Sequence, residues 1–223
     1  MRYEVIGGSF PAVVCYLNRG EAMKSEAGAM LWMDSCMEMG TSGGGASKVF
    51  GRMFSGETLF LNTYTAHADG KIAFGACVPG RILPLQVNPN RTLIVQKNGF
   101  LACEPGVDLN IHIQEKLGKG IFGGEGFIMQ RISGQGMAFI ECDGDLVEYE
   151  LAPGQDLIVD TGHVLAFEST VGFEIKRIQG AKNIMLGGEG LFNTRLVGPG
   201  KVWLQTMPIS SLADAIRPFI PTT

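Results

Sequence analysis

The chain has 223 residues, of which 45% are apolar, and a formal net charge of −4. A chain of this length buries roughly 70% of the surface that its unfolded form exposes, so it needs no disulfide or metal to hold a core. The acidic balance provides no general attraction to nucleic acid or anionic membranes, which excludes binding driven by a uniformly basic surface.

The sequence predicts a cytoplasmic protein. Its first residues, MRYEVIGGSFPAVVCYLNRGE, lack the pattern of a signal peptide, and no apolar stretch approaches the ~18 residues that span a bilayer. The five cysteines are odd in number, scattered and never in a C-x-x-C pair, which argues against disulfides and structural zinc. We expect core residues in a reducing compartment at Cys15, Cys36, Cys77, Cys103 and Cys142.

Short segments with two-residue periodicity follow one another along the chain, separated by glycine turns. One strand opens each third: PAVVCYLNRG from Pro11, GRILPLQVNPN from Gly80 and GDLVEYELAPG from Gly144. A strand, a turn and a second strand follow, and the turn glycines align as Gly28, Gly99 and Gly162. An alternating segment and a hairpin complete each third. We predict positive φ at the turn glycines, because glycine adopts it without steric cost.

The closing hairpin carries the strongest internal repeat. GGEGFIMQRISGQGMAFI from Gly123 and GGEGLFNTRLVGPGKVWL from Gly187 match at a constant offset of 64 residues. The shared landmarks are Gly124 with Gly188, Glu125 with Glu189, Arg131 with Arg195, and Gly136 with Gly200. A looser copy begins at Gly56 and Glu57. We predict that the glycines mark corners and that the glutamates accept hydrogen bonds from backbone N–H groups there.

The recurring units predict one compact all-β domain over residues 1–223, with repeats at roughly 1–79, 80–143 and 144–223. Helix is scarce. The stretch SSLADAIRPF predicts a short C-terminal helix that Ser210 or Ser211 caps and Pro218 ends. Its apolar stripe consists of Leu212, Ala215 and Ile216.

Lysines recur in the connectors before the Gly-Glu hairpins, and two explanations stay open. The first is a basic rim that binds RNA or an anionic ligand, formed by Lys48, Arg52, Lys119, Arg131, Lys182 and Arg195. The second, which we favour, is that these are solvated connectors. Trp32 and Trp203 stand on apolar strands and are not interleaved with Lys or Arg, so we expect them in the core or between subunits.

The remaining motifs predict no cofactor, no metal and no catalytic residue. GKGIFG has the spacing of a dinucleotide fingerprint, but a strand hairpin follows where a helix is required. His67-Ala68-Asp69 has the spacing of a cupin metal pair, yet its turn would point the side chains outward. Glu57, Glu125 and Glu189 would bind a cation only if a three-fold axis brought them together.

Several motifs together resemble a known family. GGASKVFGRMFSGE, the two GGEG hairpins, DTGHVLAF and GPGKVWLQTMP are similar, in this order and over essentially the whole chain, to the altered-inheritance-of-mitochondria family. The resemblance implies a short double-stranded β-helix like that of the tryptophan RNA-binding attenuation protein (TRAP-like), assembled as a homotrimer. It also implies cytoplasmic bacterial relatives and eukaryotic relatives linked to mitochondrial organisation, and it brings no catalytic residues.

The leading hypothesis is a non-enzymatic, oligomeric scaffold or interaction protein in the cytoplasm. Binding of RNA or an anionic ligand through the basic rim is the alternative, and a cupin-like metal enzyme is a second alternative. Fold analogy alone is a weak basis for any of these functions.

Overall fold

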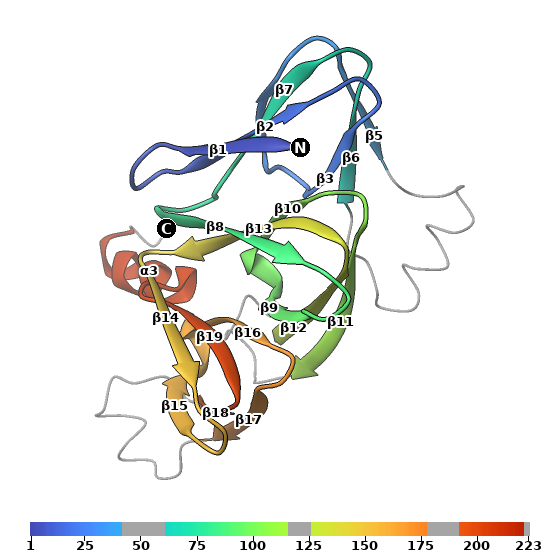
Figure 1. The fold of residues 1–223 in the computed structure, drawn as a ribbon. Helices are drawn as coiled ribbons and strands as arrows, with labels where there is room; N and C mark the ends of the chain where they lie inside the picture. The colour runs from blue at the N-terminus through green and yellow to red at the C-terminus, as the bar shows by residue number, and fades with distance from the viewer. Residues whose placement is uncertain (42–60, 116–125, 178–191, 221–223) are drawn as a thin grey trace, which may run out of the picture.

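The computed structural model describes residues 1–41, 61–115, 126–177 and 192–220, and all elements named below lie within these ranges (Figure 1). The first segment of the chain holds β1 (Arg2–Ile6), β2 (Ala12–Leu17), β3 (Ala22–Glu26), β4 (Met30–Met33), β5 (Met37–Thr41), β6 (Leu61–Ala66) and β7 (Gly70–Gly75). The middle segment holds β8 (Gly80–Val87), β9 (Leu93–Gln96), β10 (Phe100–Cys103), β11 (Val107–Glu115), β12 (Phe127–Gly134) and β13 (Gly136–Asp143). The last segment holds β14 (Leu146–Leu151), β15 (Asp156–Asp160), β16 (Val164–Glu168), β17 (Gly172–Arg177), β18 (Phe192–Val197) and β19 (Gly200–Gln205), followed by helix α3 (Ile209–Ile216).

The same antiparallel pairings recur in the three segments. In the first, β2 and β4 flank β7, while β3 and β5 flank β6. In the middle segment, β8 and β10 flank β13, while β9 and β11 flank β12. In the last segment, β14 and β16 flank β19, while β15 and β17 flank β18. Each segment therefore consists of two three-stranded units, and the first adds β1 beside β2.

One strand pair joins each segment to the next: β3 with β10, and β9 with β16. These pairs fuse units of adjacent segments into two six-stranded sheets, ordered β5-β6-β3-β10-β13-β8 and β11-β12-β9-β16-β19-β14. Two units remain unfused, β1-β2-β7-β4 and β15-β18-β17. They lie at opposite ends of the molecule, so the array of described strands is open at both ends (Figure 1).

A β-bulge marks the same position in every segment. The register of β4 on β7 shifts between Met30 and Trp32, which makes Leu31 the extra residue. Equivalent shifts in β10 on β13 and in β16 on β19 make Leu101 and Leu165 the extra residues. The three leucines therefore hold equivalent positions in the repeat. A bulge re-aims the side chain within its sheet.

The core runs through the segment boundaries. Leu101 and Phe139 of the middle segment pack with Tyr64 and Phe74 of the first, and Trp203 of the last packs in a cluster formed largely by the middle segment. The rings of Tyr64 and Phe74 meet edge to face with their centroids 5.7 Å apart. Continuous burial of this kind explains why no linker composition separates the segments.

The corner glycines were predicted with mixed success. Gly28, Gly136 and Gly200 have φ of +87°, +144° and +139°, as the turns require. The prediction was wrong for Gly99 and Gly162, which lie in 3-10 turns at Lys97–Gly99 and Thr161–His163. Such turns use right-handed φ values, so glycine is not needed for backbone geometry. At Gly99 a Cβ atom would instead lie 2.7 Å from Leu165 Cδ1, so side-chain packing requires the small residue.

The predicted fold class is confirmed, since the protein is all-β with one short C-terminal helix and several antiparallel sheets. The described strands do not close into a barrel. The capping prediction was wrong in detail, because α3 begins at Ile209 behind Pro208 and has no serine cap. Asp143 Oδ2 instead accepts a hydrogen bond from the Ile209 N–H at 2.8 Å, so a distant strand end caps the helix.

Candidate functional site

Most residues of the predicted basic rim and of the Gly-Glu motif lie outside the described part of the chain. Those residues are Lys48, Arg52, Lys119, Lys182, Gly56, Glu57, Gly124, Glu125, Gly188 and Glu189. The G-x-G-x-x-G stretch from Gly118 to Gly123 also falls outside it. Their proposed roles therefore stay predictions.

The two described arginines of the rim hold equivalent places but have different partners. Arg131 stands opposite Ile94 on β9, and Arg195 stands opposite Ile158 on β15. Arg195 Nε donates to Asp156 Oδ2 at 2.8 Å, whereas Arg131 Nη2 lies 3.3 Å from His112 Nδ1. Burial, followed by the charge of Arg131, lowers the pKa of His112, so this imidazole tends to be neutral. Within the described part of the chain, Arg195 is therefore paired with a carboxylate, whereas Arg131 contacts an imidazole.

Acids outside the Gly-Glu motif accept backbone hydrogen bonds at the corner that opens the closing strand of each segment. Lys71 N–H donates to Asp34 Oδ2 at 3.0 Å, Met137 N–H to Glu104 Oε2 at 2.7 Å, and Lys201 N–H to Glu168 Oε2 at 3.2 Å. Each donor follows the first residue of the closing strand, and each acid follows or ends the bulged strand. Sequence analysis missed these three acids, since they share no glycine motif.

Among the described residues, no group of three or more His, Cys, Asp or Glu side chains is placed to hold a metal ion. His67 and Asp69 are exposed in their turn, and His67 Nε2 contacts a carboxylate oxygen of Glu38. Burial raises the pKa of the thiols of Cys15, Cys103 and Cys142 to about 12, as fits core residues. The core prediction was wrong for Cys77, which is exposed, while Cys36 is half-buried.

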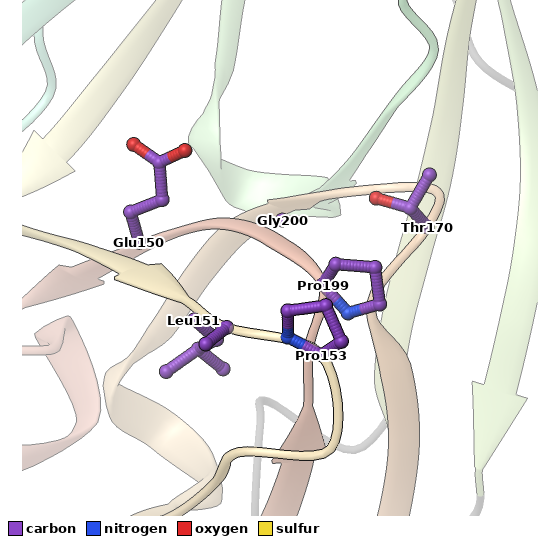
Figure 2. Close-up of a pocket in the computed structure, with 7 residues that line it drawn as sticks. Glu150, Leu151, Pro153, Thr170, Pro199 and Gly200 are labelled. Atoms are coloured by element: carbon purple, nitrogen blue, oxygen red, sulfur yellow. The ribbon is translucent and has the colours of Figure 1, made fainter.

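Two concavities occupy the same corner in different segments. One, of about 480 Å³, is lined by Glu150, Leu151, Pro153, Thr170 and Pro199 (Figure 2). The other, of about 570 Å³, is lined by residues including Leu17, Asp34 and Gly70. Leu151 pairs with Gly200 as Leu17 pairs with Gly70, so the two concavities follow from the repeated geometry.

The two open ends expose positions that are buried elsewhere in the array. The bulge residues Leu101 and Leu165 are 1% and 0% exposed, whereas Leu31 on β4 is 52% exposed. On the other edge, Ile94 of β9 is 1% exposed, whereas its counterpart Ile158 of β15 is 58% exposed. The difference arises because β10, β16 and β9 each have a strand on both sides, whereas β4 and β15 each have a described strand on one side only.

Polar side chains are buried at equivalent places in the two internal junctions. Gln205 Nε2 donates to Gln96 Oε1 and to the Gly162 carbonyl oxygen, at 3.0 Å each. At the other junction, Glu141 is buried and accepts a hydrogen bond from the Cys77 N–H at 2.8 Å. Burial raises the pKa of Glu141 to about 7, with Asp143 and Glu26 adding to the shift and the Cys77 N–H opposing it.

These features define an all-β protein of repeated antiparallel sheets whose array ends in two open, apolar edges. Residues 3–207 match the family described as Mitochondrial biogenesis AIM24, and the chain belongs to that family. An uncharacterized protein of Streptococcus pyogenes serotype M6 is 26% identical over 96% of this chain and 88% of its own length. A crystal structure of a Streptococcus pyogenes protein has the same fold, with a TM-score of 0.81 at 22% identity over 98% of this chain and 99% of that one.

The family resemblance inferred from the motifs is thereby confirmed. None of the helices in the described part of the chain has the length and apolar character that a bilayer crossing requires.

Proposed function

We propose that the protein is a non-enzymatic scaffold that works as a homo-oligomer. One observation carries the proposal: Leu31 and Ile158 are exposed at opposite ends of the array, although their counterparts within it are buried. Burial of a leucine or isoleucine side chain contributes about 1.5–3 kcal/mol, so both ends favour a protein partner over water. Apolar strand edges are also the usual sites of pairing between chains.

The remaining parts of the proposal follow the family resemblance and the composition. The chain forms one domain of three repeats with a TRAP-like double-stranded β-helix, and the oligomer is a trimer. It resides in the cytoplasm, where a reducing environment suits the five free cysteines. The contacts of Arg131 and Arg195 give no specific support to RNA as the ligand.

The mass of the native protein in solution tests the proposal. Sedimentation equilibrium, or light scattering on a sizing column, at micromolar concentration is expected to give a multiple of the 23.9 kDa chain mass. A mass of one chain across the whole concentration range would contradict an oligomeric scaffold.

A further inference from the structure

We propose that β4 of one copy pairs antiparallel with β15 of a second copy, so that the two open ends form one sheet between chains, in which β1 lies outside six strands that repeat the order of the internal sheets. This inference rests on the proposed oligomeric function and specifies its interface. The partner is a second copy of this chain, because each end is the missing half of the other.

The order of the strands shows that the ends are complementary. In both internal sheets, a unit centred on the closing strand of one segment joins a unit from the segment before it. The first sheet joins β8-β13-β10 to β3-β6-β5, and the second joins β14-β19-β16 to β9-β12-β11. The unfused units are β2-β7-β4, with β1 added outside, and β15-β18-β17. Joining β4 to β15 gives β2-β7-β4-β15-β18-β17, which repeats the internal order position by position.

The internal junctions also fix the register. Ala102 stands opposite Ser25, and Cys103 opposite Lys24. In the second junction, Ala166 stands opposite Val95, and Phe167 opposite Ile94. Counted from the shared bulge, Trp32 is the counterpart of Ala102 and Ala166, and Met33 is the counterpart of Cys103 and Phe167. The pairings on β12 and β18 make Val159 the counterpart of Val95, and Ile158 the counterpart of Ile94. The intermolecular register therefore places Trp32 opposite Val159 and Met33 opposite Ile158.

This register accounts for the side chains at the edges. It places a strand beside Leu31 and covers Ile158, which gives both the surroundings that bury Leu101, Leu165 and Ile94. Trp32 takes the place of the alanine found in both internal junctions and is itself 44% exposed. A tryptophan supplies a large contact area at small entropic cost, and it is among the residues most enriched as interface anchors.

Charge distribution separates these two edges from the others. Charged residues on an outer strand oppose pairing with another chain. Each of the outermost strands β1, β5, β8, β11, β14 and β17 carries at least one charged residue inside its two end positions. The β4 sequence MLWM carries none, and β15 carries aspartate only at its two ends, Asp156 and Asp160. The protein therefore leaves unprotected the two edges that are complementary.

A second copy is required because the two edges of one chain cannot meet. β4 pairs with β7, and β7 and β15 lie at opposite ends of the molecule (Figure 1). An interface between two different surfaces is heterologous, so successive copies add head to tail until a rotation closes them into a ring. The last segment of one copy then pairs with the first segment of the next copy in the same way as adjacent segments pair within one chain.

Cysteine cross-linking tests the register. In a background with Cys36→Ser and Cys77→Ser, we would combine Trp32→Cys with Val159→Cys and oxidise the assembled protein. Directly opposite residues of antiparallel strands have Cα atoms about 4.5–5.5 Å apart, within the range of a disulfide. The matched control combines Trp32→Cys with Leu157→Cys, two residues along the same face and about 7 Å further along the strand.

The expected result is reducible covalent multimers for Trp32→Cys with Val159→Cys, and at least ten-fold less for the control. Native mass and far-ultraviolet circular dichroism of the reduced variants show whether both still fold and assemble. A native oligomer that forms no cross-link in this register, or that cross-links equally in the control, would overturn the strand pairing while leaving the scaffold intact. A monomeric parent protein would overturn the proposed function as well.

Discussion

Leu31 and Leu165 occupy the same bulge position in their segments, yet Leu31 is half exposed and Leu165 is buried against the neighbouring segment. The sequence treats the two positions alike, and only the presence of a strand on the other side distinguishes them. The bulge position at an internal junction and the bulge position at an open end thus carry the same residue type and differ only in whether another strand covers them.

The leucine pair predicts an unequal response to truncation. In a monomeric background carrying Ile158→Asp, Leu165→Ala should lower the free energy of unfolding by about 2–5 kcal/mol, because it leaves a cavity at a segment junction. Leu31→Ala should cost less, roughly 1 kcal/mol, because its side chain is half exposed and loses only part of the burial of a core leucine. Urea titration measures both, and equal losses would show that Leu31 is already packed within its own chain.

Glu141 predicts a pH dependence of stability. Because its pKa is raised from 4.5 to about 7 in the folded protein, the folded state binds more protons than the unfolded state between these values. The stability contribution is fully present below pH 4.5 and is lost as the pH rises through 7. The free energy of unfolding should fall by on the order of 3 kcal/mol across this window.

Glu141→Gln should remove most of that slope, since the glutamine matches Gln205 at the other junction and can still accept from the Cys77 N–H. Urea titrations at several pH values measure it. Glu38→Gln is the control, because Glu38 is exposed and its pairing with His67 contributes little. An unchanged slope in Glu141→Gln would contradict the assignment to this carboxyl.

The acid at the middle corner predicts a different kind of loss. Glu104→Ala leaves the Met137 N–H without its acceptor and should cost about 1–3 kcal/mol of stability. Glu104→Gln keeps an acceptor oxygen and should cost less. Thermal unfolding of the three proteins measures the order, and an alanine variant as stable as the glutamine variant would refute the corner role.

The acidic net charge predicts how RNA affinity should respond to salt. With a net charge of −4, the protein should show no salt-dependent affinity for single-stranded RNA of the kind that release of phosphate counterions produces. Filter binding at 50 and 200 mM salt measures this. An affinity that falls more than ten-fold, and that Arg131→Ala weakens, would instead support the basic rim.

The sequence contained most of the local structure. Two-residue periodicity placed the strands, and the 64-residue offset correctly related Gly136 to Gly200. The positive φ predicted at Gly99 was wrong because a 3-10 turn does not require glycine. The glycine there instead allows close packing against Leu165.

What sequence reasoning could not supply was pairing over long distances. Nothing local to β3 predicts that Ser25 stands opposite Ala102, and the edges of the array follow only from such pairs. The corner acids Asp34, Glu104 and Glu168 were missed for the same reason, since their acceptor role depends on strands more than thirty residues away.

The central claim is that the two open ends are different surfaces that fit each other, and mixing two variants tests it most directly. Leu31→Asp should disable the β4 edge and Ile158→Asp the β15 edge, so that each variant alone sediments as a monomer. Tyr149→Asp, at an exposed site on another strand, should leave the native mass unchanged. Because each variant keeps one good edge, an equimolar mixture should form a dimer of two chains and nothing larger. A mixture that stays monomeric, or single variants that assemble as the parent does, would contradict the head-to-tail account.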